Sequence, residues 1–132
     1  MTSIDKNVRV LVAEDEAINR LYIVSLLEAR GFECVAVRNG KEAVEAFRRQ
    51  GFDIVLMDLG LPVLSGVEAS RQIREIELGT ESRAMMAALT AHDTLEDRRA
   101  AQNAGIDEFI IKPFSEIGLI ETVELMVSRG KG

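Results

Sequence analysis

The chain has 132 residues, and its 16 basic and 22 acidic side chains give a formal net charge of −6. A chain of this length usually forms one domain around a single hydrophobic core, and the 47% hydrophobic and 29% charged fractions exclude a disordered protein. The acidic balance argues against direct binding to nucleic acid, because such binders carry a basic face.

The single cysteine and the single histidine exclude further classes of site. Cys34 cannot form an internal disulfide and is predicted to be a small, buried strand residue. His92 alone excludes a metal site that needs two imidazoles from one chain. The polar segment Met1–Asn7 does not resemble a signal peptide, and no apolar run approaches the ~20 residues that span a bilayer. We therefore expect a cytoplasmic protein without membrane association.

Five apolar runs, each followed by a helical pattern, organise the chain. The predicted strands are Val8–Ala13, Cys34–Val37, Asp53–Asp58, Met85–Thr90 and Phe109–Ile111. The third run is continuously apolar, which indicates a strand buried on both faces, as in parallel sheets. Strictly alternating strands and helices predict an α/β fold with right-handed crossovers and helices on both faces of the sheet.

Helix signals separate these strands. One apolar face of the first helical pattern carries Ile18, Leu21, Tyr22 and Leu26, at the spacing of a helix that packs on a sheet. Asn39, Ser65 and Thr94 each precede an acidic residue by three positions, a spacing that predicts helix amino-terminal caps. Gly130 is expected to mark the end of the last helix.

The fourth helical segment, Thr94–Ala104, differs from the others in having few bulky apolar residues. It is rich in alanine and only weakly amphipathic, so we expect it to pack loosely on the sheet. Arg98 and Arg99 on this segment are expected to form a solvated face, or else to contact an acidic patch of a partner.

Polar residues stand where the predicted strands end. Glu14 and Asp15 follow the first strand, Asp58 ends the third, Thr90 ends the fourth and Lys112 follows the fifth. Taken singly, each has a structural explanation as a turn, cap or sheet residue. Open α/β sheets bind their ligands beyond the carboxyl ends of the strands. The convergence of these residues on that edge therefore predicts a functional site.

The charges at this edge indicate what the site binds. Carboxylates within about 5 Å of one another repel unless a cation lies between them, and Lys112 supplies only one positive charge. A few carboxylates with open water positions suit magnesium better than a calcium cage. A metal beside Asp58, Lys112 and Thr90 suits phosphoryl transfer, with Asp58 as nucleophile and the other groups stabilising the oxygens of the transferred group.

Four ordered motifs connect the edge residues with their surroundings: Val12–Glu16, Val55–Pro62 with Gly66, Ala88–Ala91 and Ile111–Phe114. Together they resemble the response-regulator receiver domain of two-component and phosphorelay signalling. The resemblance covers about Val8–Val127 and implies a flavodoxin-like, doubly wound (βα)5 fold with a five-stranded parallel sheet in the order 2-1-3-4-5. Residues 1–132 are then expected to form a single receiver domain, with its core at about 8–127 and no attached effector.

The resemblance also implies a role for each edge residue. Asp58 would be the phosphoacceptor, Lys112 would neutralise the phosphoryl group, and Thr90 would hold that group and report its presence. Phe109 occupies the aromatic switch position. The Lys112–Pro113 peptide bond stands where the family has a cis peptide, although cis bonds are otherwise a small minority before proline.

The implied metal site takes Mg²⁺ or Mn²⁺. Asp15, Asp58 and the backbone carbonyl of Gly60 would bind the ion directly, and Glu14 would act through a bound water. Gly60 and His92 flank the phosphoryl group in the family, so they would set the lifetime of the aspartyl phosphate.

The implied function is a phosphorylatable switch, not a turnover enzyme on external substrates. It would take a phosphoryl group from a histidine kinase or a histidine phosphotransfer protein. Movement of the fourth helix, the fifth strand and the last helix would then control a downstream protein effector. A free-standing regulator, a phosphorelay intermediate and a receiver cut from a hybrid histidine kinase all remain open, as does a monomer or a weak dimer.

Two alternatives belong to other classes. An aspartate-nucleophile phosphohydrolase would typically carry a second aspartate two positions after the nucleophile, where this chain has Gly60. A flavin or dinucleotide binder on the same fold would need a glycine-rich phosphate loop after the first strand, and the sequence has none.

Overall fold

The computed structural model describes residues 8–131, which form five strands and five helices in strict alternation. In chain order these are β1 (Arg9–Ala13), α1 (Ala17–Glu28), β2 (Glu33–Val37), α2 (Gly40–Gln50), β3 (Ile54–Asp58), α3 (Gly66–Glu77), β4 (Met85–Thr90), α4 (Leu95–Asn103), β5 (Glu108–Ile111) and α5 (Glu116–Lys131). Each strand boundary agrees with the sequence prediction to within one residue. The segment Met1–Asn7, for which no signal peptide is predicted, lies outside the described residues, as does Gly132.

The strands form one sheet in the order β2-β1-β3-β4-β5. All four neighbouring pairs are parallel, so the predicted doubly wound topology is confirmed. The central strand β3 is buried along its whole length, which explains why its sequence is continuously apolar. Because every strand runs in the same direction, all five carboxyl ends lie at one edge of the sheet.

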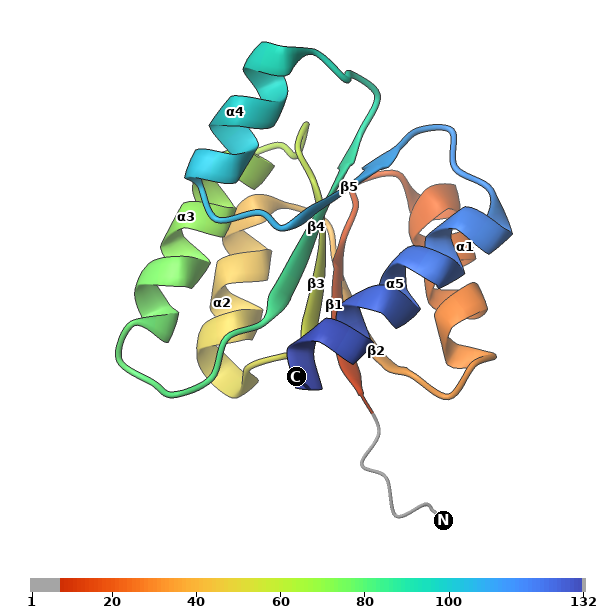
Figure 1. Ribbon diagram of the computed structural model, residues 1–132, viewed down its shortest axis with the longest axis horizontal. Coiled ribbons are helices and arrows are strands. Elements are labelled where there is room, and N and C mark those ends of the chain that lie inside the picture. The colour runs from red at the N-terminus through yellow and green to blue at the C-terminus, as the bar shows by residue number, and fades with distance from the viewer. Residues whose placement is uncertain (1–7, 132) are drawn as a thin grey trace.

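Helices cover both faces of the sheet (Figure 1). Helices α1 and α5 lie on one face, and α2, α3 and α4 lie on the other. The core on the first face includes Val12, Leu56 and Ile23, whereas the core on the second includes Phe47 and Ile73. Alternate residues of each strand thus point into two separate cores. This packing on both faces holds the strands in place, and with them the loops that follow the strands.

The three predicted amino-terminal caps are confirmed. Asn39 accepts a hydrogen bond from the backbone N–H three residues on (2.8 Å) at the start of α2. Ser65 does the same for α3 (3.2 Å) and Thr94 for α4 (3.1 Å). Each bond satisfies an N–H that the first turn of a helix leaves without a partner.

The predicted packing face of α1 is wrong. Ile18 and Leu21 are 82% and 68% exposed, and the residues that α1 buries are Ile23 and Leu27. Helix α1 carries apolar side chains on two faces, and helical spacing alone does not tell which face meets the sheet. An apolar stripe is therefore left facing outward beside the carboxyl edge of the sheet.

Two smaller predictions also fail. Helix α5 continues through Gly130 to Lys131, because Gly130 lacks the positive φ that ends a helix and that Gly105 adopts (φ 98°). Cys34 is only partly buried on β2, although this burial still raises the pKa of its thiol to about 11. Over residues 8–131, none of the helices combines the length and apolarity needed to cross a membrane.

Candidate phosphoryl and metal site

The carboxyl edge of the sheet brings together the residues that the sequence placed there. Asp58 is the last residue of β3, Thr90 is the last of β4, and Lys112 directly follows β5. Glu14 follows β1, and its backbone N–H donates to the carbonyl of Val37 at the end of β2 (3.1 Å). The site therefore rests on the ends of rigid, buried strands.

Asp58 is held from two sides. One carboxylate oxygen, Oδ1, accepts a hydrogen bond from the backbone N–H of Gly60 (2.9 Å), and Oδ2 accepts one from Nζ of Lys112 (3.0 Å). A Cβ added to Gly66 would lie 2.2 Å from the carbonyl oxygen of Asp58, so the close approach of α3 to this strand end requires glycine. Asp58 as a whole is 7% exposed, so its carboxylate is largely buried.

Glu14 is fully buried and incompletely paired. Its Oε2 accepts a hydrogen bond from the backbone N–H of Glu16 (3.1 Å). Its Oε1 lies 2.9 Å from Nζ of Lys112 but has no hydrogen bond of acceptable geometry. Burial raises the pKa of Glu14, an effect that the contact with Lys112 opposes and the charge of Asp58 reinforces. A buried carboxylate oxygen without a hydrogen bond indicates that another group completes the site.

Lys112 lies between the two buried carboxylates. Burial lowers the pKa of its ammonium, but the contacts with Glu14 and Asp58 outweigh burial and raise that pKa overall, so Lys112 stays charged. Glu14, Asp15 and Asp58 each offer a carboxylate oxygen within 4.8 Å of the others. One ammonium facing three carboxylates leaves an excess of negative charge, and this oxygen set fits a hard divalent cation such as Mg²⁺.

Arg20 on α1 contributes to the site, and the sequence analysis missed it. Its guanidinium donates to the backbone carbonyl of Glu14 (3.0 Å) and more weakly to that of Asp15 (3.4 Å). These contacts hold the loop that carries both acidic side chains. An arginine five residues after an acidic pair was the available signal, but the spacing alone did not show that the guanidinium would reach back to the backbone.

A cavity of about 330 Å³ opens beside Asp58. Its lining includes Gly60, Thr90, His92 and Lys112. The hydroxyl of Thr90 is not free, because it donates to the carbonyl of His92 (3.0 Å) and accepts from the backbone N–H of the same residue (3.0 Å). A Cβ on Gly60 would make only an ordinary 3.7 Å contact with Asp58, so space does not require glycine at that position.

The loop between β5 and α5 borders the same edge. The Lys112–Pro113 peptide bond is cis. Phe114 stacks on Tyr22 of α1 with ring centroids 6.1 Å apart. Phe109 on β5 is partly buried and lies under the side chain of Arg98 from α4. Arg98 was expected on a solvated face; its side chain is 40% exposed and also contacts Phe109, the predicted switch residue.

A doubly wound parallel sheet that gathers three carboxylates and a lysine at its carboxyl edge is the arrangement of a receiver-type α/β domain. The sequence model of the response regulator receiver domain family matches residues 10–124, and the chain belongs to this family. Receiver domains of this family occur in two-component signalling proteins, including sensor histidine kinases.

Three relatives illustrate the range of the family. The chain is 39% identical to the sensor protein GacS of Pseudomonas syringae pv. syringae over 116 residues, which cover 87% of this chain and 13% of GacS. It is 33% identical to the receiver domain of the sensor histidine kinase PA1611 from Pseudomonas aeruginosa PAO1, with a TM-score of 0.83, covering 93% of this chain and 99% of that one. That structure has magnesium coordinated in its active-site cleft.

The third relative is seen together with a partner. The Saccharomyces cerevisiae co-crystal structure of the phosphotransfer protein Ypd1 with the receiver domain of Ssk1 matches with a TM-score of 0.79 and 31% identity, covering 94% of this chain and 88% of the matched one. GacS is far longer than this chain, so similarity to it describes only one part of that protein.

Proposed function

We propose that this receiver accepts a phosphoryl group on Asp58 from a phosphohistidine of a partner protein, with Mg²⁺ or Mn²⁺ bound at Asp15, Asp58 and the carbonyl of Gly60. The observation that carries the proposal is the pairing of Asp58 with Lys112 beside a buried Glu14 oxygen that lacks a hydrogen bond. Glu14 would complete the metal site through a water. The receiver would comprise about residues 8–127.

The transfer needs a nucleophile, a neutralising cation and a donor in line. A carboxylate oxygen of Asp58 attacks phosphorus, the bond from phosphorus to the donor histidine nitrogen breaks, and its electron pair stays on that nitrogen. Lys112 neutralises negative charge on the transferred phosphoryl group, because its ammonium already lies 3.0 Å from Oδ2 of Asp58. When bound, the divalent ion neutralises the phosphoryl oxygens and the surrounding carboxylates.

Thr90 and Phe109 change their positions when Asp58 is phosphorylated. The phosphoryl group adds roughly −1.5 to −2 charge at Asp58. The Thr90 hydroxyl then leaves the His92 carbonyl and donates to a phosphoryl oxygen, which draws the loop after β4 toward the site. Phe109 and α4 follow, and the surface formed by α4, β5 and α5 changes for a protein effector.

Gly60 and His92 would set the lifetime of the aspartyl phosphate. Both line the cavity beside Asp58, and Gly60 places no side chain against the carboxylate. Water can therefore reach the phosphoryl group from this side. The same site serves a free-standing regulator, a phosphorelay intermediate or a receiver within a hybrid kinase.

The outward apolar stripe of α1 supports docking of the phosphodonor. Ile18 and Leu21 are largely exposed, Tyr22 is 43% exposed and stacks on Phe114, and Ile117 at the start of α5 is 68% exposed. This surface continues directly from the edge that carries Asp58. A histidine-bearing helix of a kinase or phosphotransfer protein that packs on the stripe would bring its imidazole to the carboxylate.

Phosphorylation of Asp58 is tested by incubation with acetyl phosphate and Mg²⁺, followed by separation of the phosphorylated form. We expect one phosphoryl group, labile to alkali and hydroxylamine, in the wild type, none in Asp58→Asn, and none in the wild type when EDTA removes the metal. Glu45→Gln changes an exposed carboxylate on α2 and serves as the matched control. Equal labelling of Asp58→Asn and Glu45→Gln would refute the assignment.

Docking is tested separately with a protein donor. Leu21→Asp should raise the KM for a phosphorylated histidine phosphotransfer protein at least tenfold while leaving labelling by acetyl phosphate unchanged. Leu78→Asp, at an 85% exposed position just after α3, is the matched control and should affect neither reaction. Equal KM values for the two variants would show that the α1 stripe is not part of the docking surface.

A further inference from the structure

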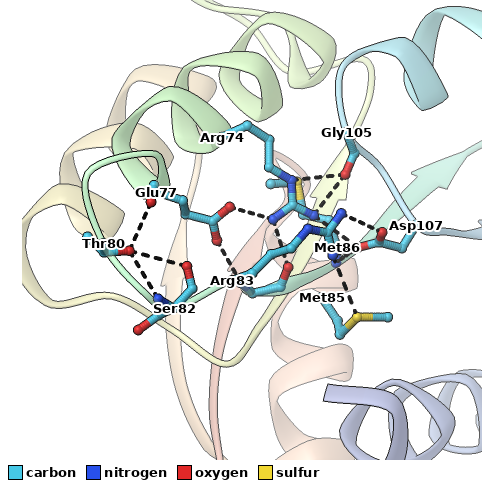
Figure 2. A network of polar contacts seen from close by, with 10 residues as sticks. Arg74, Glu77, Thr80, Ser82, Arg83, Met85, Met86, Gly105 and Asp107 are labelled. Carbon is cyan, nitrogen blue, oxygen red and sulfur yellow. Dashed lines mark hydrogen bonds and ion pairs between the residues drawn. The ribbon is translucent and has the colours of Figure 1, made fainter. Parts of the chain in front are cut away.

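Helix α4 is anchored firmly at its carboxyl end. Arg74 on α3 donates from Nε and Nη2 to the carbonyl of Gly105, which follows α4, at 3.0 and 2.8 Å, and from Nη2 to Asp107 at 2.9 Å. Figure 2 shows these bonds converging on one guanidinium. A Cβ on Gly105 would lie 2.6 Å from Cγ of Arg74, so the turn and the arginine fit closely.

The amino-terminal part of α4 is held differently. Ala101 is the residue that this helix buries, and Leu95 in its first turn is 65% exposed. Arg98 supplies contacts in this part: its guanidinium carbon lies 4.5 Å from the ring centroid of Phe109 on β5, and its Nε donates to Asp93 in the loop before α4. Arg98 thus joins the loop, α4 and β5.

These contacts form a chain that starts at the phosphoryl site. The Thr90 hydroxyl is bonded to the backbone of His92, and Asp93 is the next residue. Asp93 pairs with Arg98, and Arg98 covers the ring of Phe109. A Thr90 that turns toward a phosphoryl group releases the His92 backbone, so it disturbs the ion pair and the ring contact together.

We infer that Arg98 is a positioning residue that stabilises the unphosphorylated arrangement by holding Phe109 against α4 and α4 against the loop after β4. The inference rests on the proposed role of Asp58 and Thr90. A contact present in only one of two states shifts the equilibrium between them. Loss of Arg98 therefore favours the phosphorylated arrangement, with α4 pivoting about the end that Arg74 holds.

The neighbouring Arg99 provides a matched control. Arg99 is exposed on the same helix, and its side chain takes part in no hydrogen bond, ion pair or ring contact within residues 8–131. Arg98→Ala and Arg99→Ala thus remove the same charge from adjacent positions, and only the first removes a contact to Phe109. Arg98→Lys keeps a cation near the ring but loses the planar guanidinium.

The experiment is an NMR titration of the whole chain with beryllofluoride, a phosphoryl mimic, in the presence of Mg²⁺. Arg98→Ala should bind the mimic about two- to five-fold more tightly than the wild type, the range that an exposed cation–π contact supplies. Arg99→Ala should match the wild type, and Arg98→Lys should fall between them. The Phe109 ring resonances of metal-free Arg98→Ala should move toward their positions in the mimic-bound wild type.

The outcomes separate this inference from the function on which it rests. Equal affinities of Arg98→Ala and Arg99→Ala, or weaker binding by Arg98→Ala, would overturn the role of Arg98 while leaving Asp58 as phosphoacceptor. Failure of the wild type to bind the mimic, or equal binding by Asp58→Asn, would overturn the phosphoacceptor assignment and this inference with it.

Discussion

Two clusters of charged side chains lie at opposite edges of the sheet, and they differ in how completely their charges are matched. At the amino ends of β4 and β5, Arg74 and Arg83 face Glu77 and Asp107, with nitrogen–oxygen distances of 2.6 to 2.9 Å (Figure 2). At the carboxyl edge, Lys112 is the one basic side chain within residues 8–131 that pairs with Glu14 and Asp58, and Asp15 adds a third carboxylate within 4.8 Å of theirs.

The matched cluster is also fully hydrogen-bonded. Glu77 accepts from the backbone N–H of Ala84 (2.6 Å), Asp107 accepts from that of Met86 (2.9 Å), and Arg74 reaches two backbone carbonyls. Its carboxylates have no need of an added cation. The same residue types support the fold where every charge is paired and every polar atom is hydrogen-bonded. They indicate a ligand site where a carboxylate oxygen has no hydrogen bond and negative charge is in excess.

The largest expected effect is on the matched cluster. Arg74→Ala should lower the free energy of unfolding by about 3 kcal/mol, because it leaves the buried Glu77 carboxylate without its arginine partner and removes one of the two arginines that pair with Asp107. Urea unfolding measures the loss. Arg71→Ala, which breaks an exposed ion pair on the same helix, should cost less than about 0.5 kcal/mol. A similar loss in both variants would show that the Arg74 cluster contributes no more to stability than an exposed ion pair.

The second expected effect is stabilisation by a divalent ion bound at the unmatched cluster of Glu14, Asp15, Asp58 and Lys112. Mg²⁺ at ten times its dissociation constant should stabilise the wild type by about 1.4 kcal/mol, since the ion binds the folded chain only. Asp15→Asn should abolish most of this gain, and Arg71→Ala should retain it. Melting temperatures recorded with Mg²⁺ and with EDTA provide the measurement. A metal-independent melting temperature in the wild type would contradict the assignment of a divalent site.

A smaller change in the free energy of unfolding is expected when one glutamate in each cluster is replaced by glutamine. In EDTA at neutral pH, Glu14→Gln should raise the free energy of unfolding by about 1 kcal/mol, because it relieves repulsion in a site kept for function. Glu77→Gln should lower it, because Glu77 is matched by Arg74. Urea midpoints of the two variants should therefore move in opposite directions. A shift of the same sign in both would erase the distinction between the clusters.

The pKa of Glu14 gives this contrast a pH dependence. Burial raises that pKa in the folded protein, so between the ordinary value of 4.5 and the raised value the folded state binds more protons than the unfolded state. Stability of the metal-free wild type should therefore rise as the pH falls through the raised pKa toward 4.5. The advantage of Glu14→Gln over the wild type should shrink over the same range, and an advantage that stays constant would contradict the raised pKa.

The sequence predicted much of the site because its residues stand at strand ends. In a parallel sheet all carboxyl ends meet at one edge, so the positions of Asp58, Thr90 and Lys112 along the chain were enough to bring them together. The capping residues Asn39, Ser65 and Thr94 were equally readable, since each cap is a local interaction over three residues.

Other features depended on contacts between distant segments. The face of α1 that meets the sheet was predicted wrongly, because Ile18 and Leu21 and the buried Ile23 and Leu27 form two apolar faces of one helix. Neither the reach of Arg20 to the Glu14 backbone nor the position of Arg98 over Phe109 follows from spacing along the chain.

The sequence by itself determined the order of the elements, their direction and the edge at which the acidic residues gather, because hydrophobic periodicity and strand–helix alternation are local and repeat along the chain. Only the tertiary structure decided which charges are matched. Arg74 and Asp107 lie 33 residues apart in sequence, and Lys112 and Asp58 lie 54 apart. Whether a charge is matched depends on neighbours brought close by packing, so a carboxylate can support the fold at one edge and carry unmatched charge at the other.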